Sequence, residues 1–141
     1  MRMAGACRKN ITFTLYPHRV DLVRIFSKVS EFSPISSPGH FKICNWENTL
    51  DAFMKLKAQY CHMQSGEIFL EIAGRCRLRL YVNEYGVGCE CTDRTPDLIL
   101  DELSATKYIF GPYPPIYTST APTIAQSWFP LPMSWNGQDR I

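Results

Sequence analysis

The sequence has little that is typical of an enzyme's active site. It contains no glycine-rich phosphate-binding loop, since Gly86-Val-Gly88 is too short. Asp93, Asp97 and Asp101 recur at four-residue spacing, but no histidine, lysine or serine is placed to work with them, and the three histidines are scattered. We therefore expect a protein that is not an enzyme and that has no cofactor.

Long apolar runs are also missing. No stretch approaches the roughly 20 apolar residues that span a bilayer, and MRMAGACRKN is not followed by an apolar run of the signal-peptide type. We expect a cytoplasmic protein without a transmembrane segment, in which the six cysteines are reduced. Cys89 and Cys91 fall on one face of a predicted strand, and Cys76 on the adjacent strand points the same way. A C-x-C spacing is not that of a zinc knuckle, so we expect these cysteines to be core residues that bind no metal.

The composition is that of one globular domain, with 45% hydrophobic and 20% charged residues in 141. The net charge of +2 is unevenly spread: residues 1–45 hold seven bases and two acids, whereas residues 46–106 hold six bases and ten acids. A cationic end can attract anionic lipid, or it can be a solvated face. The predicted membrane- or anion-binding residues are Arg2, Arg8, Lys9, Arg19, Arg24 and Lys28.

The first half of the chain predicts one short strand and two helices. Residues 11–16 alternate between apolar and polar, which is typical of a strand, and apolar residues at three-residue steps predict a helix over about 18–29. Residues 33–39 have the composition of a loop, and residues 40–44 form a second strand candidate. A central helix begins after Asn45 or Asn48 and ends near residue 60.

The second half predicts an antiparallel meander over residues 67–92, because apolar residues there recur at every second position. Thr95 and Pro96 form a helix start, so we expect a helix over about 96–106. The fold class is therefore α+β: a small antiparallel sheet packed with two or three helices. We place the globular domain at residues 1–110.

Three arginines on one face of the second meander strand resemble a phosphate-binding stripe. However, three glutamates fall on the same face of the neighbouring strands, and opposite charges across strands stabilise sheets. We therefore expect cross-strand ion pairs rather than a nucleic-acid surface. The six residues are Glu67, Glu71, Arg75, Arg77, Arg79 and Glu90.

From residue 111 the chain becomes rich in proline and aromatic residues, and we expect residues 111–141 to form an extended tail. This tail carries a P-P-x-Y motif in Pro114-Pro115-Ile116-Tyr117. Two prolines in a polyproline II helix present a ridge to a WW domain, and the tyrosine fills a second pocket. The predicted partner-binding residues are Pro114, Pro115 and Tyr117. The bulky aromatic residues Trp128, Phe129 and Trp135 could instead anchor the tail to the body.

Together with Ser119-Thr120-Ala121-Pro122, this motif resembles the late-domain region of enveloped-virus matrix and Gag proteins. In that family, P-P-x-Y recruits WW-bearing ubiquitin ligases and P-T/S-A-P recruits the membrane-scission machinery. The second motif departs from the family at Ser119, where the family has proline, so only the first is carried over.

The resemblance implies a self-associating viral matrix-type adaptor that lies at the inner membrane surface and enters virions. The alternative is a cytosolic binding, immunity or inhibitor protein that covers a basic partner with an acidic surface. The carboxylates of that surface would be Glu84, Glu90, Asp93, Asp97 and Asp101.

Overall fold

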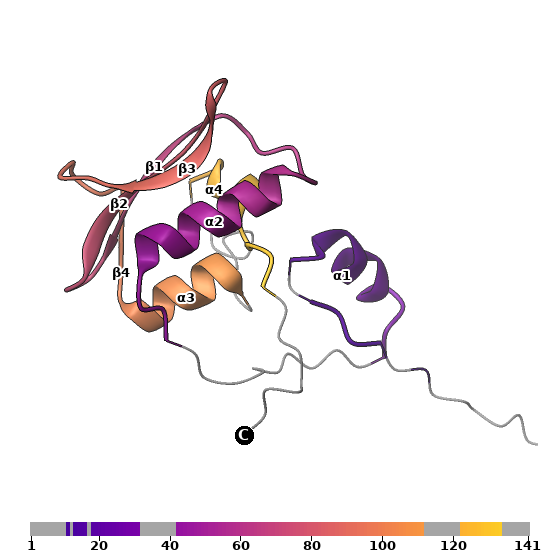
Figure 1. Ribbon diagram of the computed structural model, residues 1–141. Helices are drawn as coiled ribbons and strands as arrows, with labels where there is room; N and C mark the ends of the chain where they lie inside the picture. The colour runs from indigo at the N-terminus through magenta and orange to yellow at the C-terminus, as the bar shows by residue number, and fades with distance from the viewer. Residues whose placement is uncertain (1–10, 12, 17, 32–41, 112–121, 134–141) are drawn as a thin grey trace, which may run out of the picture.

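A four-stranded sheet with helices on one face forms the body of the protein (Figure 1). The computed structural model describes residues 11, 13–16, 18–31, 42–111 and 122–133. Within these residues the helices are α1 (Val20–Phe26), α2 (Trp46–Ala58), α3 (Glu102–Phe110) and α4 (Ala125–Trp128). The strands are β1 (Gly66–Ile72), β2 (Cys76–Asn83), β3 (Gly86–Cys91) and β4 (Leu98–Leu100), in the spatial order β3-β2-β1-β4.

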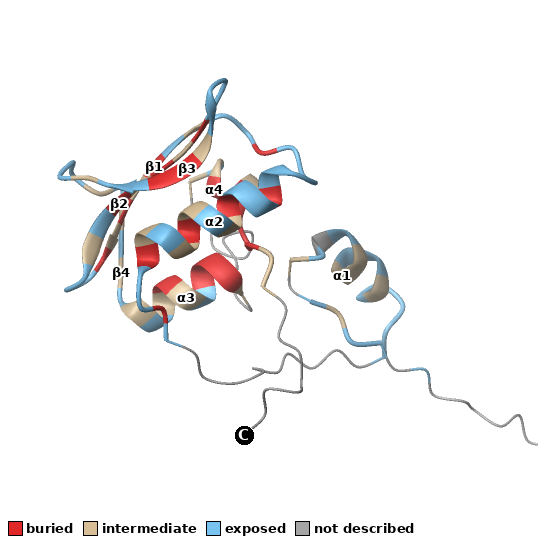
Figure 2. Ribbon diagram, viewed as in Figure 1, coloured by how far each residue is buried: buried red, intermediate tan, exposed pale blue. Residues whose placement is uncertain are grey.

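Strands β1, β2 and β3 form the predicted antiparallel meander, with Leu70 opposite Leu78 and Leu80 opposite Cys89. Alternate side chains of β1 and β2 are buried against the helices, whereas those between them face outward (Figure 2). The register predicted from the period-two pattern is therefore confirmed. The buried side chains are Ile68, Leu70, Ile72, Leu78, Leu80 and Val82.

Helix α2 begins where the sequence predicts. The Asn45 side chain accepts a hydrogen bond from the Asn48 backbone N–H at 2.9 Å, which satisfies one of the free donors of the first turn. Leu50 and Met54, four residues apart and so on one face, are fully buried in the common core.

The prediction of a helix over 96–106 is wrong in its first half, because residues 98–100 form β4, parallel to β1. The Asp97 carboxylate accepts a hydrogen bond from the Phe69 N–H at 2.9 Å, and the Asp97 N–H donates to the Phe69 carbonyl at 2.7 Å. These bonds tie the chain to the open edge of β1. The helix starts later, at α3, where Asp101 accepts from the N–H groups of Leu103 and Ser104.

The prediction that the chain is extended from residue 111 onward is wrong at residues 125–128. Helix α4 lies there, and Trp128, Phe129 and Leu131 are buried in the same core as the sheet. Their large apolar surfaces explain this packing. The remaining residues of the predicted tail, 112–121 and 134–141, lie outside the described residues.

Of the elements predicted before residue 45, only the helix is confirmed, as α1. Residues 11 and 13–16 form no strand, and neither do residues 42–44 of the second strand candidate. Phe13 instead packs on Phe26 of α1, with ring centroids 4.7 Å apart. The predicted loop at 33–39 lies outside the described residues. The fold is α+β as predicted, but the sheet is mixed rather than purely antiparallel.

Candidate functional site

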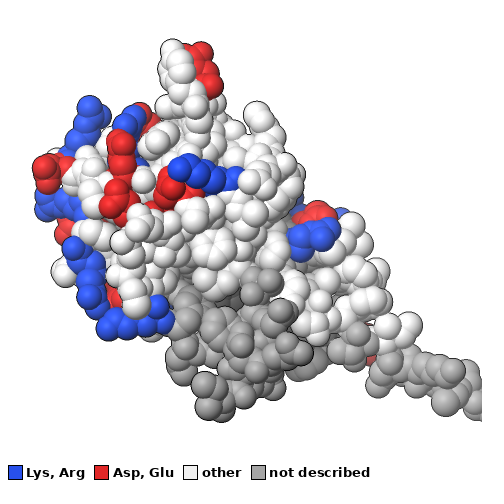
Figure 3. Space-filling model, in the orientation of Figure 1, with Lys and Arg blue, Asp and Glu red and all other residues white. Residues whose placement is uncertain are grey.

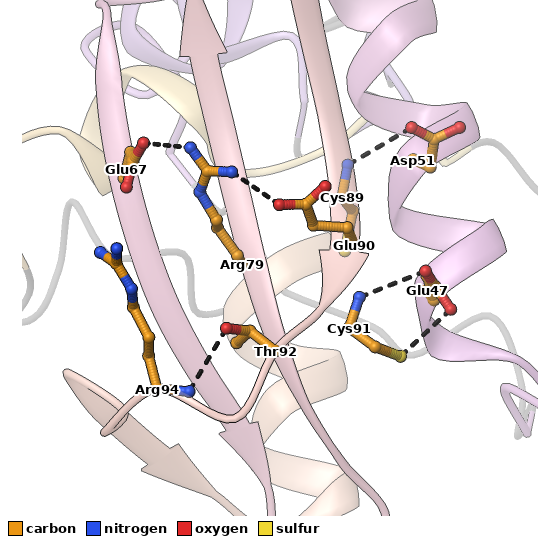
Figure 4. A network of polar contacts seen from close by, with 9 residues as sticks. All are labelled: Glu47, Asp51, Glu67, Arg79, Cys89, Glu90, Cys91, Thr92 and Arg94. Carbon is orange, nitrogen blue, oxygen red and sulfur yellow. Dashed lines mark hydrogen bonds and ion pairs between the residues drawn. The ribbon is translucent and has the colours of Figure 1, made fainter.

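The outer face of the sheet is covered by ion pairs between strands (Figures 3 and 4). Arg79 on β2 pairs with Glu67 on β1 and, at 2.6 Å, with Glu90 on β3, while Arg77 pairs with Glu71 at 2.6 Å. The Glu67 partner raises the pKa of Arg79, and Arg79 in turn holds the pKa of Glu67 below its usual range. The predicted cross-strand pairing is thus confirmed for these two arginines.

The third arginine, Arg75, does not pair across the strands as predicted; it forms an ion pair with Glu102 of α3 at 3.2 Å. The guanidinium of Arg79 also lies over the ring of Tyr81, and that of Arg94 lies over Phe69, at 5.1 and 5.4 Å from the ring centroids. The arginines and the outward aromatic rings of this face therefore contact groups of the protein itself.

Helix α2 covers the outer edge of β3. The carboxylates of Glu47 and Asp51, one turn apart, accept hydrogen bonds from the backbone N–H groups of Cys91 and Cys89, at 3.2 and 3.3 Å (Figure 4). Gly88 directly precedes Cys89, and a Cβ there would be 2.7 Å from the Tyr81 hydroxyl. Side chains of α2 thus occupy N–H groups that an added strand would use.

The three cysteines that the sequence predicts to be core residues differ in burial: Cys89 is buried, Cys76 is half-buried and Cys91 is exposed, so a core position is confirmed only for Cys89. Burial raises the pKa of Cys89 and of Cys76, and the hydrogen bond from its thiol to Glu47, at 3.1 Å, raises the pKa of Cys91. In the part of the chain that the structure describes, no group of three or more His, Cys, Asp or Glu side chains is arranged to hold a metal ion.

The acidic residues considered for catalysis or for partner binding are largely used inside the fold. Asp97 and Asp101 hold β4 and α3 as described above, and Glu90 is paired with Arg79. Asp93, Asp97 and Asp101 do not stack on one helix, because a strand separates the last two. Three of the five carboxylates of the alternative acidic surface are therefore already engaged.

A buried lysine holds the chain segment that follows the P-P-x-Y motif. The Lys57 ammonium, on α2, donates to the backbone carbonyls of Trp128 and Pro130 at 2.8 and 3.1 Å. Burial lowers the pKa of Lys57, and the Trp128 indole N–H donates to the Gln64 carbonyl at 2.8 Å. Lys57 is not among the residues predicted from the sequence, although its spacing after Leu50 and Met54 places it on the buried face of the helix.

The segment before the motif is equally fixed. Phe110, at the end of α3, is buried and packs edge-to-face with Phe53 of α2 at 5.4 Å. The backbone N–H of Leu131 donates to the Ile109 carbonyl at 2.7 Å, which ties the two flanks together. Residues 112–121, including Pro114, Pro115 and Tyr117, lie between these flanks in the sequence and outside the described residues.

Three of the six predicted membrane- or anion-binding residues are described, and they differ in their surroundings. Arg19 pairs with Asp21 at 3.2 Å, whereas Arg24 and Lys28 are exposed on and just after α1. The structure therefore does not gather the described three into one cluster of equivalent cations. Arg2, Arg8 and Lys9 lie outside the described residues.

Within the described ranges no helix is both long and apolar enough to cross a bilayer. Comparisons of the chain with protein-family models, with curated proteins and with solved structures found no match.

Proposed function

We propose that this protein is a non-enzymatic adaptor of the viral matrix type, which lies at a membrane and recruits WW-domain proteins through Pro114-Pro115-Ile116-Tyr117. The observation that carries the proposal is the anchoring of both flanks of the motif in one core, through Phe110 on one side and Trp128 on the other. A recognition segment joined at both ends to a folded body stays part of that body when a partner binds it. The chain then links the partner to whatever surface the body occupies.

The charge pattern also supports an adaptor. The carboxylates that the alternative function needs are largely engaged within the fold, and the outer arginines are paired. Residues 1–45 hold seven bases and two acids, and of the described bases among them Arg24 and Lys28 are exposed.

The test is titration calorimetry with a WW domain of the ubiquitin-ligase type, using full-length protein and a peptide of residues 111–123. Both should bind, and Tyr117→Ala should abolish binding in both, because alanine removes the ring that fills the second pocket. Ser119→Ala is the matched control, since it lies outside the four-residue motif and should bind like the wild type.

Deleting the region after residue 110 is not a suitable control, because it would remove Trp128, Phe129 and Leu131 from the core. Binding by the peptide alone would mean that the motif is hidden in the folded protein. Binding by neither would remove the recruiting function.

A further inference from the structure

Helix α1 and the turn after it carry an exposed apolar stripe beside a basic one. The Ser27 N–H donates to the Val23 carbonyl and the Ser30 N–H to the Phe26 carbonyl, each at 2.9 Å, so the chain keeps turning past the end of α1. Ile25 and Val29, four residues apart, therefore lie on one side, and their side chains are 59% and 76% exposed. We define the α1 patch as Arg24, Ile25, Lys28 and Val29.

The basic stripe of the α1 patch is formed by Arg24 and Lys28, which are also four residues apart and are both exposed. Among the described residues, Arg19 forms an ion pair with Asp21, whereas Arg24 and Lys28 form none. Their charges are therefore not neutralised in the way that those of Arg77 and Arg79 on the sheet are.

The apolar stripe is not used by the core of the protein. Figure 1 shows α1 apart from the sheet and from α2 and α3, and in Figure 2 none of the α1 residues whose burial is described is buried. No described residue of α1 belongs to the hydrophobic core, and the preceding segment adds two more exposed apolar side chains, Ile11 at 75% and Phe13 at 58%. Phe13 contacts Phe26, so this segment and α1 form one exposed apolar unit.

We propose that the α1 patch binds the interface of an anionic lipid bilayer, with Ile25 and Val29 inserted at the acyl boundary and with Arg24 and Lys28 at the headgroups. Exposed apolar residues next to lysine and arginine on a short amphipathic helix are the chemistry of interfacial membrane binding. The charge of the surrounding sequence is complementary to such a surface, because residues 1–45 hold seven bases and two acids. This inference deepens the membrane-peripheral part of the proposed function and rests on it.

The test is co-sedimentation of the full-length protein with phosphatidylcholine vesicles that contain or lack phosphatidylserine. The wild type should bind the anionic vesicles and not the neutral ones. Each basic residue near an anionic surface contributes about fivefold to the partition coefficient, so Arg24→Gln/Lys28→Gln should lower it about 25-fold. Ile25→Ser/Val29→Ser should lower it at least about tenfold, since each inserted CH₂ group adds to the affinity.

Matched controls come from exposed residues elsewhere in the chain. Ile99→Ser removes an equally exposed isoleucine, 61% exposed, from β4, and Lys42→Gln/Lys107→Gln removes two exposed positive charges outside the α1 patch. Both controls should retain binding more closely than the matching α1 variants. Because the replaced side chains are exposed, every variant should keep the circular dichroism spectrum and melting temperature of the wild type.

Several results would overturn the proposal: equal binding to both vesicle types, no binding to either, or binding that Ile25→Ser/Val29→Ser leaves unchanged. A change of oligomeric state caused by Ile25→Ser/Val29→Ser in sedimentation without vesicles would mean that a second copy of the chain covers the α1 patch instead. Tyr117→Ala should leave vesicle binding intact, so failure here and failure of WW-domain recruitment are distinguishable.

Discussion

Replacing Trp128 with alanine should destabilise the entire domain, although this residue lies in the region that the sequence predicts to be a tail. Its side chain is fully buried. A tryptophan buries about 150–250 Å², and at about 25 cal/mol per Å² this corresponds to roughly 4–6 kcal/mol as an upper value. The alanine variant also loses the indole donor to the Gln64 carbonyl.

We expect Trp128→Ala to lower the free energy of unfolding by about 3–5 kcal/mol, the usual cost of removing a buried aromatic side chain. This is a large part of the roughly 5–15 kcal/mol that stabilises a typical domain. Urea denaturation followed by far-ultraviolet circular dichroism measures the change. Fluorescence is less suitable, because the substitution removes one of the three tryptophans.

Leu103→Ala is the control for this experiment. Leu103 lies on α3 with 62% of its surface exposed, so its truncation should change the free energy of unfolding by no more than about 0.5 kcal/mol. If Trp128→Ala costs no more than Leu103→Ala, the segment after residue 121 does not belong to the core, and the argument that both flanks of the P-P-x-Y motif are anchored fails.

Two further predictions concern the sheet and α3. Leu78→Asp should cost several kcal/mol of folding free energy, because it places a carboxylate at a fully buried position. Arg77→Ala removes only an exposed ion pair, which is worth about 0–1 kcal/mol. Equal losses for the two variants in urea denaturation would contradict the register of β2. The hydrogen bonds from the Ser104 hydroxyl and from backbone N–H groups hold the pKa of Asp101 below its usual range. The Asp101 carboxylate therefore stabilises the folded protein fully above the unfolded-state pKa of about 3.9. This contribution to the free energy of unfolding is lost as the pH falls through the lower, folded-state pKa. The urea midpoint of Asp101→Ala should therefore lie below that of the wild type at about pH 7, and the gap should narrow toward about pH 2; a constant gap would show that the carboxylate charge is not involved.

The meander and α2 could be predicted because their signals are local. In β1 and β2, every second residue is apolar over six or more positions, and only a half-buried strand buries such a pattern on one side. Asn45 caps the helix that follows it in the sequence, so this interaction needs no distant partner. The cross-strand pairs of Arg77 and Arg79 followed directly once the register was known.

Local signals were misleading where a distant partner decides the structure. Thr95 and Pro96 form a valid helix start, yet the open edge of β1 takes Leu98–Leu100 as a strand, because Asp97 hydrogen-bonds to Phe69. Residues 11 and 13–16 have the alternation of a strand but have no neighbouring strand to pair with among the described residues.

The candidate sites likewise divide into those that the sequence alone predicts and those that depend on the tertiary structure. The sequence by itself determined the P-P-x-Y motif and the basic N-terminal third, because composition and short motifs are properties of the chain alone. Only the tertiary structure decided that Trp128 and Lys57 fasten the segment after the motif to the core, and that Ile25 and Val29 remain exposed. The physical reason is that burial depends on which surfaces meet: an aromatic residue in a proline-rich segment is buried only if the body leaves room for it, and a helical apolar stripe stays exposed if the core is already filled.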